Sequence, residues 1–386
     1  MDVKIALRLR LHALYRALTT EPWQTPLSVA CGAHVALYVL ITFFVGLFPG
    51  EPASKPGFWA AMAQWDGEWY LRIATEGYKW LGPTVQSAVV FFPIYPLLGK
   101  IAGMLVGDIH WGMLIVTNVS CVLYFYYLYR LTAEEFDAGT AERAVVYAGV
   151  FPAAFVLASF YSEATSFALA VAAFYYARRG RWPLAIVLGC LTTASRFAGI
   201  SIVFPLAYEY WRQRGLNRQA LAIGLVPLGL IAFAVYVWWL SGDPFTLVTV
   251  EHTAWFHSFT PPWETIRLAL DRARWPLQHY VVSVSLLDAG SILLFIGLTV
   301  WTMLKLPPAY WLYALPILIG ALSQTVDPQK APPTQSISRY LMAMFPAYIA
   351  LAQAARNRIL DQTVRWTFAI LMGVFAIYFF SRYWVA

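Results

Sequence analysis

Apolar segments about twenty residues long recur along nearly the whole chain, and they restrict its fold more than any other feature. A helix of that length crosses the ~30 Å hydrocarbon core of a bilayer. Charge is correspondingly scarce: 12% of the 386 residues are Asp, Glu, Lys or Arg, against about 25% in soluble domains. The sequence therefore predicts an all-α polytopic membrane protein, with residues 1–386 forming a single domain.

Candidate membrane spans follow from this pattern. Residues 88–107 are apolar but contain Pro93, Pro96 and Lys100, so we expect a re-entrant or interfacial segment there that does not cross. About eleven spans are predicted in the remaining apolar segments, near residues 27–48, 111–130, 141–160, 163–178, 183–200, 199–211, 219–240, 280–303, 309–325, 339–354 and 364–384.

Basic residues predict the orientation. Residues 1–26 are expected to form a basic amphipathic helix on the cytoplasmic face. Most Lys and Arg then lie inside, as the positive-inside rule requires, and this explains the net charge of +7 without a nucleic-acid partner. Three polar loops lie outside, at 49–110, 241–280 and 326–338. The sequence therefore predicts a multi-pass membrane protein with these loops on the non-cytoplasmic side.

The densest charge lies in residues 65–78, WDGEWYLRIATEGY, within the first outside loop. As a helix, this stretch aligns three charged residues in an ion-pair ladder with four-residue spacing: Glu68, Arg72 and Glu76. It also aligns an apolar stripe suited to the bilayer interface: Trp65, Trp69 and Ile73. Both patterns predict a helix that rests on the outer membrane surface.

Asp66 belongs to neither pattern. No basic residue follows it three or four positions on, and Gly67 beside it allows close approach of a substrate. An unpaired carboxylate near the outer surface is a candidate general base. A helix N-cap is the alternative role, and spacing alone does not decide between them.

Three further charged residues interrupt apolar segments. Glu163 falls at a tight outside turn, where it either lines a cavity or ends a helix in solvent. Arg196 lies in an otherwise uncharged span, and Arg339 lies at the outer start of another. Intramembrane arginines indicate a functional site, and two of them suit a lipid-linked phosphate. Extension of each side chain to the interface is the alternative.

The second outside loop combines aromatic and polar side chains, including Glu251, His252 and Trp255, and we expect it to bind sugar. The spacing of its acidic and histidine residues matches no zinc pattern, so no metal is expected. Tyr95, in the proline-broken segment, and Glu68 are further candidates for binding the donor. The chain contains no nucleotide-binding fingerprint or nucleophile elbow, and no cofactor is expected.

With these residues in place, the chain resembles the PIG-V mannosyltransferase family and its shorter bacterial relatives. The resemblance covers roughly residues 25–350, and Glu251 departs from it where relatives often have Gln. It is carried by WDGEWYLRIATEGY (65–78), FFPIYPLL (91–98), FPAAFVLASFYSE (151–163), TASRFAGI (192–199) and SRYLMAMFP (338–346).

The resemblance implies a GT-C-type fold with juxtamembrane helices in the first outside loop. It implies a place in a bacterial plasma membrane with the active site outside, or in the endoplasmic reticulum membrane with a lumenal active site. It implies inverting transfer of mannose from a polyprenyl- or dolichyl-phosphate donor to a hydroxyl of a glycolipid or other membrane-associated acceptor. Asp66 matches the family's catalytic aspartate. The phosphate leaving group needs no general acid, unlike that of the two-carboxylate glycosidases, and we expect Arg196 and Arg339 to stabilise its charge.

Other functions remain open at this point. A GT-C enzyme could move a different lipid-linked sugar, because sugar identity depends on a few hydrogen bonds. A lipid or sugar transporter could use Arg196 and Glu163 to line a translocation path. A non-catalytic subunit of a glycosylation complex is the third alternative.

Overall fold

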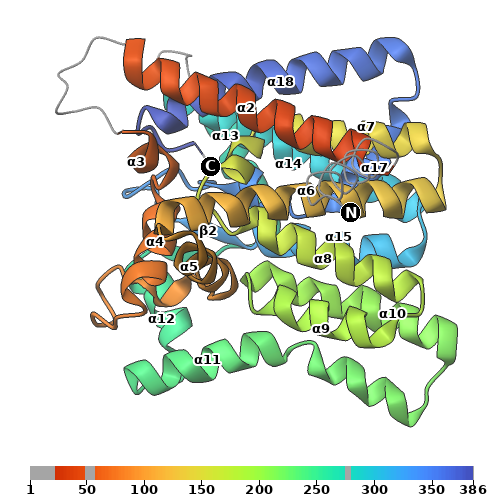
Figure 1. Cartoon of the computed structure of the whole chain (residues 1–386), viewed down its shortest axis with the longest axis horizontal. Coiled ribbons are helices and arrows are strands. Elements are labelled where there is room, and N and C mark those ends of the chain that lie inside the picture. Colours follow the sequence, from red (N-terminus) through yellow and green to blue (C-terminus); the bar gives the residue numbers. More distant parts are fainter. Residues whose placement is uncertain (1–21, 48–56, 274–279, 386) are drawn as a thin grey trace, which may run out of the picture.

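Helices make up nearly all of the structure, a computed structural model that describes residues 22–47, 57–273 and 280–385. The long helices lie side by side with roughly parallel axes (Figure 1). Most of the expected amphipathic N-terminus, 1–26, lies outside the described residues. In chain order the elements are α2 (Gln24–Leu47), α3 (Phe58–Met62), α4 (Asp66–Glu76), η2 (Ala88–Val90), α5 (Ile94–Val106), α6 (Ile109–Glu135), α7 (Ala138–Val150), η3 (Ala154–Ala158), α8 (Glu163–Arg178), α9 (Trp182–Thr193), η4 (Phe197–Ile202), α10 (Val203–Arg214), η5 (Arg218–Leu225), α11 (Leu228–Ser241), α12 (Thr246–Thr253), β1 (His257–Phe259), α13 (Pro262–Ala273), α14 (Tyr280–Lys305), α15 (Pro308–Leu322), β2 (Gln324–Val326), α16 (Ile337–Leu341), α17 (Phe345–Ala354) and α18 (Arg358–Phe380).

Fewer helices than expected are long enough to cross a bilayer alone. Among the described residues, four helices qualify by length and composition, in α2, α6, α14 and α18. Helices η5 and α11, bent by 44° at their junction, would add a fifth. The polytopic helical character is confirmed, but the count of eleven spans is not. Several expected spans are broken: in 141–160, for example, α7 ends at Val150 and a 3-10 helix follows Pro152.

The proline-broken segment forms a short helix that packs tightly on α6. With 13 residues, α5 is about 20 Å long, too short to cross the hydrocarbon core. This length agrees with the expectation that 88–107 does not cross. A Cβ atom on Gly112 of α6 would lie 2.2 Å from the backbone nitrogen of Gly103. Glycine is therefore required here, because the two backbones are in contact.

Helix α8 is the centre of the bundle, and nearly all of its side chains are buried. A helix that is apolar on every face belongs in such a position. Figure 1 shows that α8 begins at the end of the bundle where α3, α4, α5 and α12 gather. Its first residue is Glu163. Strands β1 and β2 pair there in antiparallel register, with His257 opposite Val326. This pairing joins the second predicted outside loop to the end of the predicted span 309–325, where the third loop begins.

Candidate active site

The turn that begins α4 places the Asp66 side chain. Asp66 is the first residue of the helix, and Trp65 before it has a φ of 56°. No side chain caps this helix end, so the alternative that Asp66 is the N-cap is wrong. A Cβ atom on Gly67 would lie 3.2 Å from the carbonyl oxygen of Met62 and 3.4 Å from that of Phe160. Gly67 therefore allows the turn to press against residues 151–163.

Two hydrogen bonds fasten this contact. The Phe160 backbone N–H donates to the Met62 carbonyl oxygen at 3.0 Å. The Tyr161 hydroxyl donates to the Gln64 carbonyl oxygen at 3.2 Å. Because both bonds lie next to Glu163, the segment that enters α8 is fixed relative to Asp66.

A chain of four alternating charges results. Arg339 Nη1 donates to Asp66 Oδ2 at 2.6 Å. Glu163 Oε1 lies 3.5 Å from Arg339 Nε and 2.7 Å from Arg196 Nη1. The four side chains come from the start of α4, from α16, from the start of α8 and from the turn before η4. We call them the charge chain: Asp66, Arg339, Glu163 and Arg196.

Burial makes this pairing necessary. Glu163 and Arg339 are 0% and 4% exposed, whereas the outer members Asp66 and Arg196 are 14% and 17% exposed. An unpaired buried charge is strongly destabilising. In the charge chain, the negative charges of two carboxylates balance the positive charges of two guanidinium groups. Solvent and ligands can therefore reach the charge chain at its Asp66 and Arg196 ends.

The structure corrects four predictions or alternatives here. Asp66 has no partner on its own helix, but it is not unpaired, because Arg339 contacts it from 273 positions away. Glu163 is fully buried, so it is not a solvated helix end. Arg339 pairs inside the protein and does not extend to the interface. Arg196 lies in the turn between α9 and η4, because the span expected at 183–200 ends at Thr193.

Hydroxyl groups and aromatic rings support the charge chain. Ser162 Oγ accepts from Arg196 Nη1 at 3.2 Å and is 2.7 Å from the Tyr70 hydroxyl. The Arg339 guanidinium carbon lies 5.3 Å from the ring centre of Tyr161 and 5.5 Å from that of Tyr340. Such cation–π contacts stabilise a buried guanidinium. Tyr70, Tyr161 and Tyr340 were not predicted as site residues.

Aromatic packing joins α4 to the second outside loop. The ring of Trp69 lies parallel to that of Phe91, with centres 5.9 Å apart, and meets Trp255 edge-on at 5.8 Å. Ile73 is buried. The prediction that Trp69 and Ile73 face the bilayer interface is therefore wrong, since both pack against protein. The Trp255 indole N–H is buried without a hydrogen-bond partner among the described residues.

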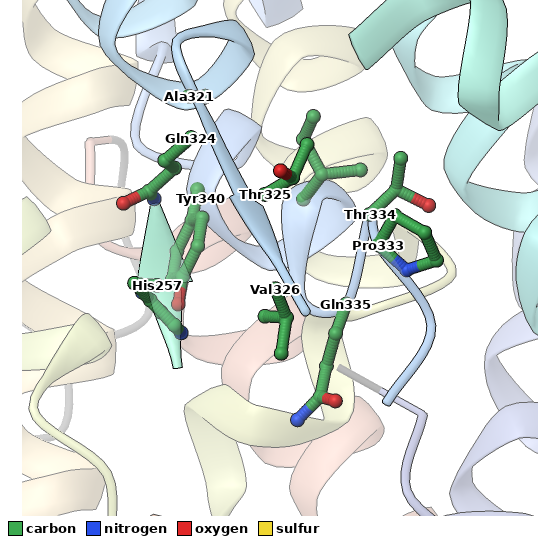
Figure 2. Close-up of a pocket in the computed structure, with 10 residues that line it drawn as sticks. His257, Ala321, Gln324, Thr325, Val326, Pro333, Thr334, Gln335 and Tyr340 are labelled. Carbon is green, nitrogen blue, oxygen red and sulfur yellow. The ribbon is translucent and has the colours of Figure 1, made fainter. Parts of the chain in front are cut away.

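Glu251 and His257 lie beside this aromatic group. Glu251 Oε2 is 3.3 Å from His257 Nδ1, and 43% of the Glu251 side chain is exposed. Despite that exposure, the surrounding protein raises the pKa of Glu251 to about 7, and the nearby Asp66 carboxylate adds to the rise. Burial lowers the pKa of His257, against the attraction of Asp66. Figure 2 shows His257 next to Tyr340 in a small pocket lined also by Gln324, Thr325 and Thr334.

The other predicted site residues lie apart from the charge chain. Glu68 is exposed and pairs with Arg72 at 2.5 Å, as the ladder predicts, whereas Glu76 pairs with Lys79 instead. His252 is exposed on α12. Tyr95 is fully buried behind Tyr70 and bonds Thr117 Oγ1 at 2.8 Å. In the described part of the chain, no three His, Cys, Asp or Glu side chains gather where they could hold a metal ion.

Part of the chain matches a known protein family. Residues 51–215 match the family model of mannosyltransferase (PIG-V), which confirms the resemblance over the part of the chain that holds Asp66, Glu163 and Arg196. No curated protein matches the chain by sequence.

The fold is supported by its similarity to one solved structure. ArnT from Cupriavidus metallidurans, crystallised with undecaprenyl phosphate, is similar with a TM-score of 0.50 and 14% identity, over 86% of this chain and 61% of ArnT. The Archaeoglobus fulgidus oligosaccharyltransferase in the apo form has a TM-score of 0.46 and 15% identity, over 92% of this chain and 56% of the oligosaccharyltransferase. The chain thus spans less than two thirds of either protein. The predicted GT-C-type fold is confirmed.

Proposed function

We propose that this protein is an inverting membrane glycosyltransferase that moves a sugar, best assigned as mannose, from a polyprenyl- or dolichyl-phosphate donor to a hydroxyl acceptor. The observation that carries the proposal is the charge chain, in which the partly exposed Asp66 carboxylate contacts Arg339 and Glu163 links Arg339 to Arg196. Three of its four members, Asp66, Glu163 and Arg196, lie in the segment that matches mannosyltransferases. ArnT, whose fold is similar, was crystallised with a polyprenyl phosphate. That carrier belongs to the proposed donor class.

Asp66 serves as the general base in this proposal. The acceptor oxygen attacks C1 of the sugar from the face opposite the phosphate, and a C–O bond forms as the C1–O(phosphate) bond breaks. The phosphate leaves with the bonding electron pair, and the acceptor proton passes to the Asp66 carboxylate. Attack from the opposite face inverts the configuration at C1.

The arginines stabilise the leaving phosphate. Arg339 contacts Asp66 at 2.6 Å, so a phosphate bound at this arginine would lie close to the base. Arg196 lies at the accessible far end of the charge chain. Glu163, buried between them, keeps both guanidinium groups in place before the donor binds. Preorganised cations of this kind contribute strongly where charge develops in the transition state.

Glu251, His252 and Trp255 form the proposed sugar-binding side of the site. Trp255 packs on Trp69, one turn along α4 from Asp66. Its buried indole N–H is a free donor for a sugar hydroxyl. The proposed active site faces the non-cytoplasmic side of the membrane, with the acceptor a glycolipid or another membrane-associated molecule.

The direct test incubates the purified protein in detergent or nanodiscs with polyprenyl-phosphate mannose, glucose, galactose and arabinose, and with membrane lipids as acceptors. Mass spectrometry of the lipid fraction should show one added hexose from the mannose donor. Transfer from one of the other donors would change the sugar assigned to the enzyme but leave the proposed reaction class unchanged. Movement of labelled lipid across the vesicle membrane with no new glycoside would favour a transporter instead.

A further inference from the structure

Asp288 is an acid buried inside a membrane-spanning helix, and no step proposed above uses it. It lies near the N-terminal end of α14 and is 0% exposed. Burial of a carboxyl group costs several kcal/mol unless hydrogen bonds compensate. An acid at such a position is by default a candidate for function.

Both oxygens of Asp288 accept hydrogen bonds, one from the chain that leads into α16 and one from the first turn of α16 itself. Thr334 Oγ1 donates to Oδ2 at 3.1 Å, and the Ser338 backbone N–H donates to Oδ1 at 3.4 Å. The carboxyl group therefore bridges two points four residues apart. Arg339, which holds Asp66, is the residue immediately after Ser338.

Helix α16 needs support from outside itself. It has only five residues, and the side chain of its N-cap residue, Ser336, makes no capping hydrogen bond. A single turn is unstable alone, because too few hydrogen bonds offset the cost of nucleation. Ser336, which precedes the helix, has a φ of 69°, a strained value for a residue other than glycine. Thr334 lies two residues before this strained position, and Figure 2 shows it beside Pro333 at the pocket wall.

We propose that Asp288 is a positioning residue for Arg339: its two hydrogen bonds fix the start of α16 so that the guanidinium group reaches Asp66 and Glu163. The expected effect on kinetics rests on the proposed function, whereas the structural role of the two hydrogen bonds does not depend on it. Asp288 acts through Arg339 and does not touch the substrate. Its effect on catalysis should therefore disappear when Arg339 is absent.

A double-mutant cycle tests this dependence. Asp288→Asn removes one acceptor oxygen, and we expect kcat/KM for the donor to fall about five- to tenfold. In an Arg339→Ala background the same change should alter kcat/KM by less than about twofold. Thr299→Val is the matched control, because Thr299 lies in α14, is buried and bonds only the Phe295 carbonyl of its own helix at 2.7 Å. It should leave kcat/KM unchanged.

Equal losses in both backgrounds would overturn the proposal and leave Asp288 a general stabiliser of the fold. If Asp288→Asn does not accumulate, Thr334→Val removes one of the two bonds from the other side and takes its place in the cycle. Hydrogen exchange supplies a readout independent of activity: amides 337–340 should exchange at least about threefold faster in Asp288→Asn and unchanged in Thr299→Val. Unchanged exchange in both variants would refute the positioning role even if the wild-type protein transferred no sugar.

Discussion

The sharpest test of the site replaces Asp66 by Asn, which keeps the shape of the side chain but removes its charge. The substitution weakens a 2.6 Å charged hydrogen bond to Arg339, worth about 1.5–3 kcal/mol. Arg339 keeps Glu163 as a counter-charge at 3.5 Å, so we expect a protein that is destabilised but still folds.

Activity should fall much further than stability. Loss of a general base costs about 10²–10⁴-fold in rate, which corresponds to about 3–5 kcal/mol of activation free energy. Sugar transfer at saturating donor, followed by mass spectrometry, measures this loss. The thermal midpoint from tryptophan fluorescence measures the effect on folding.

Glu68→Gln is the matched control, two positions away on the same helix. Glu68 pairs with Arg72 on the surface and is 58% exposed, and such pairs contribute about 0.3–0.5 kcal/mol. Its rate should stay within about twofold of wild type. The reasoning is refuted if the two variants lose similar activity, or if Asp66→Asn keeps more than a tenth of the wild-type rate at equal folded fraction.

Three further predictions follow from the same contacts. Arg339→Ala should raise KM for the lipid-phosphate donor about tenfold or more, because a charged contact to phosphate is lost. Glu251→Gln should make the thermal midpoint less dependent on pH. Burial raises the pKa of Glu251 in the folded protein to about 7, above the ordinary pKa of a glutamate, ~4.3. The wild-type protein should therefore lose stability as the pH rises from ~4.3 through 7. Gly67→Ala should lower the free energy of unfolding by about 1–3 kcal/mol, because its Cβ would lie 3.2 Å from the Met62 carbonyl oxygen.

Each of these has its own check. Unchanged donor KM in Arg339→Ala would exclude a phosphate contact. A wild-type midpoint that rises between pH 5 and 7, and a Glu251→Gln protein with the same slope, would show that this carboxyl group is not protonated on folding. For Gly67→Ala, the control is Gly290→Ala, an exposed position of α14 with open space around it. That change should be neutral or stabilising by up to about 1 kcal/mol.

Sequence reasoning identified the charged residues of the site but not how they pair. Helical spacing found the Glu68–Arg72 contact, because both residues lie on one helix. It could not find the partner of Asp66, since Arg339 comes from a distant segment. Spacing also put Trp69 and Ile73 on one face correctly, but it does not tell what that face contacts. Asp288 carried a signal that was missed: an acid within an apolar segment, the same feature that marked Arg196.

The number of spans was the least predictable part of the fold. Hydropathy detects apolar segments, but in several of these the helix breaks before it is long enough to cross. Thus α7 stops at Val150, and α15 ends at Leu322 after 15 residues. A bundle buried around α8 can hold short and broken helices, because protein and not lipid surrounds their ends.

The charge chain also constrains how the protein is made. Its members are contributed in the order Asp66, Glu163, Arg196 and Arg339, and the last is separated from the first by 273 positions. At about 5–20 residues per second, the ribosome needs roughly 14–55 seconds between them. Until α16 emerges, the nascent chain carries two acids for one arginine and cannot bury them at neutrality. Arg339, the last member to be synthesised, therefore decides when this end of the bundle can close. A chain truncated before Arg339 would have one acid of the charge chain without a basic partner, and burying that charge would destabilise the fold.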